Sequence, residues 1–188
     1  AGSNSAFGEV WWFYCSTASN QVDKYVIWNY QENLWYTGSL DRSTWVDSGT
    51  YPLPYATKYD GTNSTLLIHE SGKDDDGSTM TSFIESGDFD IGDGDDILFI
   101  NKVIPDFKGQ VGNVNISLKS RYFPTDTQTT KGPFRYSTSS TKINTRTRGR
   151  QVAVRLESNG FNDINNDATG EDWRLGTIRF EVQPDGKR

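Results

Sequence analysis

The sequence has very few of the residues that build most metal and nucleophilic sites. Among its 188 residues there is one cysteine, Cys15, and one histidine, His69. A single cysteine excludes a disulfide within the chain and a zinc site made of several cysteines. A single histidine excludes histidine-pair metal motifs and leaves one candidate base for a serine-histidine-aspartate triad. The position of Cys15 within an aromatic run predicts a buried, unreactive thiol.

Other absences narrow the function further. No apolar run approaches the length of a membrane-spanning helix, and the first residues lack the charged-then-apolar layout of a secretion signal. The serines lack the Gly-x-Ser-x-Gly pattern of a nucleophile elbow, His69 has no nucleophile pattern around it, and there is no phosphate-binding loop. We therefore expect no enzymatic activity and no cofactor.

Tryptophan is what the sequence has in excess. Five of the six tryptophans fall within the first 45 residues, at Trp11, Trp12, Trp28, Trp35 and Trp45. Aromatic and β-branched runs at 9–16, 24–30 and 34–40 are separated by short polar breaks, which predicts a three-stranded antiparallel meander. Such an aromatic sheet cannot bury both faces alone, so the pattern indicates one blade of a β-propeller.

The rest of the first half predicts two more short strands and a boundary. Residues 55–58 and 66–70 are strand-like, and the acidic stretch 72–78 has too few apolar residues to be anything but a loop. We place the domain boundary there, giving domains 1–71 and 72–188. Residues 1–6 resemble a linker, and because the chain opens on Ala1 we expect a processed or excised fragment.

The second half predicts a β-sandwich. Candidate strands lie at 80–91, 97–105, 113–122, 134–137, 149–158 and 173–183. Within 151–157 the apolar residues Val152, Val154 and Leu156 alternate with Ala153 and Arg155, as in an antiparallel strand with one face on a core and one in water. Apolar residues at helical spacing do not persist. The predicted fold is therefore all-β and antiparallel throughout.

Charge is distributed unevenly along the chain, whose net charge is −6. Residues 70–96 contain ten acids and one base, whereas residues 97–155 contain eleven bases and two acids. This asymmetry favours surfaces of opposite sign, suited to packing between subunits or along a polyanion. Solvated strand faces and loops are the simpler alternative.

The acidic segment contains the most metal-like sequence. Asp88-Phe-Asp-Ile-Gly-Asp-Gly-Asp-Asp96 has the carboxylates and glycines that can wrap Ca²⁺, but it lacks the later glutamate of an EF-hand. A turn between two strands explains the same residues without metal, and we expect no metal ligands. The acidic residues that we expect on a loop or channel surface are Asp74, Asp75, Asp76, Asp93, Asp95 and Asp96.

The basic segment places three arginines at a period of two. In an extended chain Arg146, Arg148 and Arg150 would share one face, with Lys142 just before them. Guanidinium groups in this arrangement suit carboxylates of another subunit or phosphates of a DNA backbone. Aromatic stacking partners are missing nearby in the sequence, so acidic partners within an assembly are the first expectation and phosphate the second.

Taken together, these patterns resemble a family of virion proteins. The resemblance is carried by Glu-Val-Trp-Trp-Phe-Tyr at 9–14, by 23–35 and 38–45, by the acidic block 85–96, by Arg-Thr-Arg-Gly-Arg-Gln at 146–151, and by 172–176 with 184–186. In these segments the chain is similar to the C-terminal part of the tail nozzle (tail tubular protein B) of short-tailed phages.

This resemblance implies a structural role. A ring of such subunits would extend the tail channel of a virion, contact its own copies and neighbouring virion proteins, and meet DNA transiently through backbone contacts that ignore base sequence. The protein would be made in the host cytoplasm and end in the virion tail.

Two other functions are compatible with the sequence. The tryptophans, Trp11 and Trp35 among them, could stack on sugars in a glycan-binding module of a host-recognition protein. Residues 39–45 resemble the Asp-box turn of sialidase-like propellers, which makes a propeller-type hydrolase the third alternative.

Overall fold

The computed structural model describes residues 1–74, 77, 80–158 and 170–187, without the side chains of residues 93 and 187. These residues form two compact units, Ala1–Gly72 and Lys73–Arg188, and each is considered by itself. All paired strands are antiparallel, and the described residues contain no α-helix and a single 3-10 turn, η1 (Gly92–Gly94). The expected all-β antiparallel fold is confirmed.

The first unit begins with a four-stranded meander. Its strands are β1 (Gly2–Asn4), β2 (Glu9–Tyr14), β3 (Lys24–Asn29) and β4 (Leu34–Ser39), and their order in the sheet is their order in the sequence. The three predicted strands are present, but the expected linker at 1–6 is wrong. Gly2 to Asn4 pair with Trp11 to Glu9, so the first residues extend the sheet.

A second sheet of the first unit contains β5 (Thr44–Val46), β6 (Tyr55–Tyr59) and β7 (Ser64–Ile68). The sequence did not predict β5, because three residues are too short for a periodic pattern. Trp45 of β5 stacks on Trp11 of β2 with ring centroids 5.2 Å apart, and its indole nitrogen donates to the carbonyl of Ser3 at 2.7 Å. Trp45 therefore packs the second sheet onto the meander.

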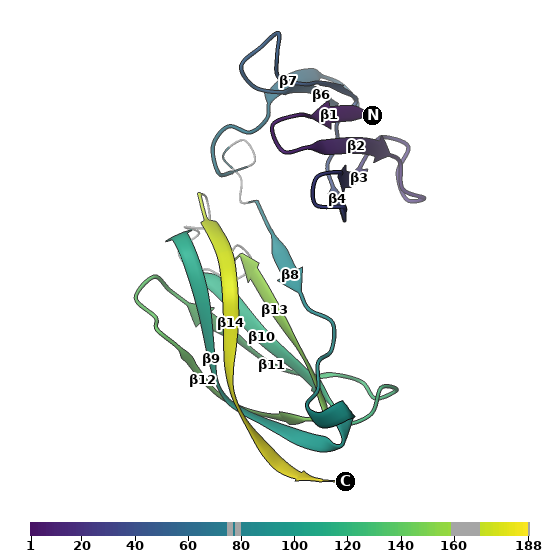
Figure 1. The fold of residues 1–188 in the computed structure, drawn as a ribbon. Helices are drawn as coiled ribbons and strands as arrows, with labels where there is room; N and C mark the ends of the chain where they lie inside the picture. The colour runs from purple at the N-terminus through teal and green to yellow at the C-terminus, as the bar shows by residue number, and fades with distance from the viewer. Residues whose placement is uncertain (75–76, 78–79, 159–169, 188) are drawn as a thin grey trace. The chain divides into compact units, whose positions relative to one another are not determined.

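The second unit is a sandwich of two sheets (Figure 1). One has the order β11-β10-β13-β8 and the other β12-β9-β14. The strands are β8 (Phe83–Glu85), β9 (Asp96–Val111), β10 (Val114–Arg121), β11 (Thr129–Tyr136), β12 (Ile143–Gly149), β13 (Gln151–Ser158) and β14 (Asp172–Lys187). Their facing sides enclose a continuous core in which Leu98, Ile100, Ile116, Leu118 and Leu156 are fully buried.

Several strands differ from the expected ones: β9 continues to Val111, β11 begins at Thr129, and β12 was not among the expected strands. Two further differences have local reasons. Of the expected strand 80–91, only Phe83–Glu85 joins the sheet, followed by an isolated bridge at Phe89. The expected strand 149–158 is separated from β12 at Gly149, where the chain passes from one sheet to the other. A side chain at Gly149 would lie within 3.1 Å of the carbonyl oxygen of Arg121, so this crossing is tight.

The alternation predicted for β13 is confirmed on its core side. Val152, Val154 and Leu156 are buried in the sandwich core. On the opposite side Ala153 was expected in water but is only 2% exposed. Ala153 pairs with Lys119 of β10. The ammonium of Lys119 forms an ion pair with Glu85 of β8, and β8 lies on the other side of β13 from β10. The aliphatic stem of Lys119 thus passes over Ala153.

Candidate functional surfaces

The single histidine belongs to a packed cluster in the first unit. His69 follows β7, its ring lies 4.7 Å from that of Trp45, and its Nε2 accepts a hydrogen bond from Arg42 Nε at 2.8 Å. Arg42 is only 4% exposed and also donates to the backbone and carboxylate of Asp41. The geometry therefore gives His69 a packing and anchoring role.

The tryptophans of the meander are divided between its two faces. Trp11 points inward and stacks on Trp45, whereas Trp12, Trp28 and Trp35 share the outer face because Trp28 pairs with Trp35 and Trp12 pairs with Val26. The Trp12–Trp35 and Trp28–Trp35 ring centroids are each 6.0 Å apart. We call these three residues the tryptophan face, and Trp35 in it is 62% exposed.

The second sheet of the first unit also exposes an apolar outer face. Ala56 and Trp45 are on its inner side, while Val46, Tyr55 and Ile68 are paired in register on its outer side with Leu66 nearby. Val46, Leu66 and Ile68 are each more than half exposed. We call these three residues the aliphatic face. The first unit thus leaves apolar side chains uncovered on both outer sides.

Cys15 does not behave as expected. It lies directly after β2, which ends at Tyr14, and it is an exposed free thiol rather than a buried one. The expected strand 9–16 ends two residues later than β2 does. Because Cys15 lies beyond the end of the strand, its side chain is exposed to solvent.

Only some of the predicted acidic residues have side chains that the structure describes, and these lie in different local settings. Asp75 and Asp76 lie outside the described residues, as does the side chain of Asp93, whose backbone is part of η1. Asp74 Oδ1 accepts a hydrogen bond from the backbone of Gly77 at 3.1 Å, Asp95 is exposed, and Asp96 begins β9. Within the described ranges no three His, Cys, Asp or Glu side chains are placed to hold a metal ion.

Arginines approach the acidic turn instead. Asp88 forms an ion pair with Arg121 and accepts from Gln128 at 3.0 Å. Arg150 Nε donates to the carbonyl of Gly94 at 2.6 Å, and its guanidinium carbon lies 6.0 Å from the centre of the Phe123 ring. This turn is therefore joined to the sandwich by charge-assisted hydrogen bonds.

The basic residues of the segment 142–150 lie in three different environments. Arg146 and Arg148 are exposed on the outer side of β12, as the period of two predicts, and Lys142 is exposed just before this strand. The expectation that Arg150 shares their face is wrong, because β12 ends at Gly149 and Arg150 turns toward η1. Arg148 Nε lies 2.5 Å from Asp185, a carboxylate of the same chain.

Arg146 lines a groove that the sequence did not reveal. The groove has a volume of about 530 Å³ and runs between β11 and β12, which are edge strands of the two different sheets. Lys131 and Phe134 of β11 line it together with Asn144, Thr145 and Arg146 of β12. The sequence near Arg146 lacks an aromatic residue, but β11 contributes the ring of Phe134 to the groove.

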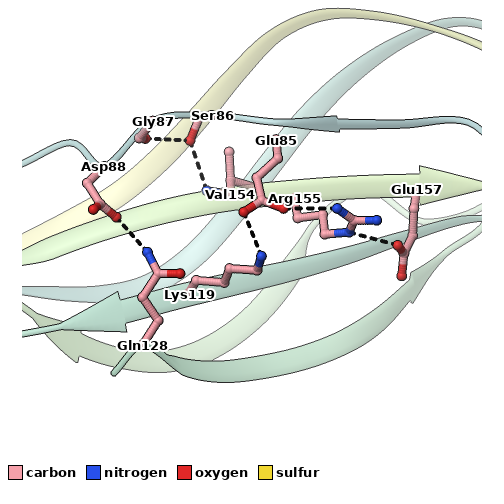
Figure 2. Close-up of polar contacts among 9 residues, drawn as sticks. All are labelled: Glu85, Ser86, Gly87, Asp88, Lys119, Gln128, Val154, Arg155 and Glu157. Atoms are coloured by element: carbon pink, nitrogen blue, oxygen red, sulfur yellow. Dashed lines mark hydrogen bonds and ion pairs between the residues drawn. The ribbon is translucent and has the colours of Figure 1, made fainter. Parts of the chain in front are cut away.

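A polar network covers the outer face of β8, β10 and β13 (Figure 2). Glu85 accepts from Lys119 at 2.6 Å and from Arg155 at 2.9 Å, and these hydrogen bonds hold the pKa of Glu85 below its ordinary value of 4.5. Arg155 also pairs with Glu157 at 2.8 Å and lies 4.1 Å from the centre of the Phe83 ring. Because these charges are mutually paired, the network secures β8 to the sheet.

Comparison with known proteins identifies no family for this sequence. No protein-family model matches the sequence, and the search of curated proteins finds no match either. In the part of the chain that the structure describes, no helix has the length and apolar character required to cross a membrane. The surfaces described above are therefore the basis for assigning a function.

Proposed function

We propose that this protein is a structural, non-enzymatic subunit of a viral tail or virion, and specifically a phage tail-nozzle subunit that lines or extends a DNA channel. The observation that carries the proposal is the pair of uncovered apolar faces of the first unit. The tryptophan face and the aliphatic face lie on the outer sides of two sheets whose inner sides pack through Trp11 and Trp45.

The arrangement of the first unit supports this assignment. Four antiparallel strands in sequence order are the strand order of a propeller blade, and β5 to β7 pack on the inner face of the meander as a neighbouring blade would. Blades of a propeller are covered on both faces by their neighbours. Exposed apolar patches of this kind mark interaction surfaces, so further β-sheets of the same assembly are the proposed cover.

The charges of the second unit fit sequence-independent contact with DNA. Lys131 and Arg146 line the groove between β11 and β12, and Lys142 is exposed at the start of β12. Contacts of this type neutralise phosphates and weaken steeply with salt. The exposed carboxylate of Asp95 would limit tight binding and allow a DNA strand to slide past.

The proposal is tested by locating the protein in intact virions. Gold-coupled antibody fragments raised against this protein mark its copies without labelling the cysteines of other virion proteins. Electron microscopy is expected to show labels arranged in a ring at the tail, and mass photometry of the purified assembly is expected to show one closed oligomer. Single labels, or a monomer released from virions, would contradict the proposal.

Matched variants test the surfaces that carry the proposal. Trp35→Ser and Leu66→Ser each remove one side chain from an uncovered face. We expect both to shift the oligomer toward smaller species without lowering the unfolding midpoint of the monomer. Tyr122→Ser removes an exposed aromatic of the second unit and serves as the control. Assembly that is equally insensitive to all three variants would argue against these faces as subunit contacts.

The tryptophan face also favours a second candidate, a glycan-binding module. Trp12, Trp28 and Trp35 present neighbouring rings along an open sheet surface, an arrangement on which sugar rings can stack. Trp11 is unsuitable for this role because it faces inward against Trp45. A glycan array separates the candidates, since Trp35→Ala would abolish glycan binding while the size of the oligomer stayed unchanged.

A further inference from the structure

One buried polar atom of the first unit lacks a partner. Asn4 of β1 is 0% exposed, and its Oδ1 accepts no hydrogen bond from the residues that the structure describes. The other end of the carboxamide is satisfied, because Nδ2 donates to Glu70 Oε1 at 2.9 Å. Leaving a buried acceptor unpaired is unfavourable, so a hydrogen-bond donor or a cation is expected at this oxygen.

Two carboxylates from different elements neighbour this carboxamide, one as its cross-strand partner and one as its hydrogen-bond partner. Glu9 of β2 is the direct cross-strand partner of Asn4, so their side chains share one face of the sheet. Glu70 follows β7 and is the hydrogen-bond partner of Asn4. Burial raises the pKa of Glu9, and the nearby charge of Glu70 raises it further, as expected for two carboxylates close enough to repel each other.

The position of Glu9 is fixed from a third side. Trp11 Nε1 donates to Glu9 Oε2 at 3.0 Å, and the ring of Trp11 is held by its stacking on Trp45. One carboxylate oxygen is thus anchored. The three side chains differ in exposure, since Asn4 is fully buried, Glu9 is half-buried and Glu70 is exposed.

We propose that Asn4 Oδ1 and the carboxylates of Glu9 and Glu70 bind a hard divalent cation, with Ca²⁺ as the best chemical match. Ca²⁺ is bound in proteins by carboxylate and amide oxygens in flexible geometry, and water completes its coordination. The ion would satisfy the unpaired oxygen and cancel the repulsion between the two carboxylates. It would also link β1 and β2 of the meander to the segment after β7.

The acidic segment that most resembles a calcium loop in the sequence is not involved. The proposed site consists of residues from the two ends of the first unit, with an amide oxygen in place of a third carboxylate. With only three side-chain ligands, we expect a dissociation constant on the order of 10⁻⁴–10⁻³ M, as for Ca²⁺ sites of extracellular modules.

Tb³⁺ luminescence and thermal unfolding test the site in the full chain. Tb³⁺ occupies Ca²⁺ sites and emits when a nearby tryptophan is excited, and Trp11 is hydrogen-bonded to one proposed ligand. We expect Tb³⁺ emission that Ca²⁺ displaces, and an unfolding midpoint that rises with Ca²⁺ relative to EDTA. If neither Ca²⁺ nor Mg²⁺ at millimolar concentration changes emission or midpoint, the proposal is wrong.

Two variants distinguish Ca²⁺ binding at the proposed site from nonspecific binding of Ca²⁺ to acidic surfaces. Glu70→Gln keeps the shape of the side chain and removes one charge, and we expect at least tenfold weaker Ca²⁺ binding. Glu32→Gln removes an exposed carboxylate elsewhere in the same unit and is expected to leave the affinity unchanged. An equal response of the two variants would overturn the assignment.

A third variant tests whether a cation or a proton satisfies the buried carboxamide of Asn4. Asn4→Asp adds a carboxylate, so we expect a lower midpoint in EDTA than wild type and a larger rise with Ca²⁺. If acidification in EDTA shifts the tryptophan emission and Ca²⁺ has no effect, a proton on Glu9 satisfies Asn4 and the cation site is excluded.

Discussion

At the scale of single residues, side chains of the same type differ in burial and therefore in their contribution to stability. Leu118 is fully buried among the core residues of the sandwich, whereas Leu66 lies on the aliphatic face and is 65% exposed. Truncating a buried leucine loses the transfer free energy of its methyl groups and leaves a cavity. Truncating an exposed one loses little in the isolated protein.

Leu118→Ala is therefore expected to lower the free energy of unfolding by about 2–5 kcal/mol. Leu66→Ala is the matched control, with an expected change within about 0.5 kcal/mol. Urea unfolding followed by circular dichroism measures both. Comparable effects of the two substitutions would show that the assigned burial is incorrect.

The tryptophans show how far single residues could be predicted from the sequence. Alternation along β2 predicts that Trp11 and Trp12 point to opposite faces. It cannot say which face is covered, because the cover is Trp45 on β5, a strand too short to be recognised. Likewise, the buried carboxamide of Asn4 has no signature in the sequence, since Glu70, the acceptor for its Nδ2, lies 66 positions away.

At the scale of secondary-structure elements, β8 is a short edge strand secured by side chains. It has three residues and, among the strands that the structure describes, its one partner is β13. Glu85 accepts hydrogen bonds from Lys119 of β10 and Arg155 of β13, so one carboxylate links three neighbouring strands. These partners are distant in the sequence, and only the strand order β10-β13-β8 brings them together.

Glu85→Gln is expected to destabilise the protein by about 1 kcal/mol near neutral pH, since partly exposed ion pairs contribute modestly. The pKa of Glu85 is lowered in the folded state from 4.5 by its bonds to Lys119 and then Arg155. The stabilisation is thus fully present above that value and is lost as the pH falls below it.

The measurement compares unfolding free energies of wild type and Glu85→Gln across this range. The difference between them is expected to be constant above about pH 5.5 and to shrink as the pH is lowered further. A difference that grows on acidification would contradict the ion-pair assignment. Lys119→Gln removes one of the two partners and should show a smaller effect of the same sign.

At the scale of the whole molecule, the chain contains two compact units with separate cores. Ile27 and Ala56 are buried in the first unit, and the sandwich core lies within the second. The all-β class and the sandwich followed from strand periodicity and turn residues. Outside the predicted meander, the pairing of strands into sheets did not, because order within those sheets depends on contacts between residues far apart in the sequence.

Separate cores predict separate unfolding transitions. Five of the six tryptophans belong to the first unit, so tryptophan fluorescence reports mainly on that unit. Ile27→Ala is expected to lower the fluorescence midpoint, while Leu118→Ala lowers only the midpoint of the sandwich seen by circular dichroism. If both probes shift together for either variant, the two units unfold as one.

The pairing of β14 with β9 sets a limit on when the sandwich can form during translation. β14 pairs along β9 and contributes Ile178, Phe180 and Val182 to the core, yet it is synthesised after every other strand described here. Until it leaves the ribosome, β9 has an unpaired edge and that side of the core is open to water. The sandwich is therefore expected to reach its native state only after β14 has been made, and ribosome-bound chains ending before β14 should remain sensitive to protease.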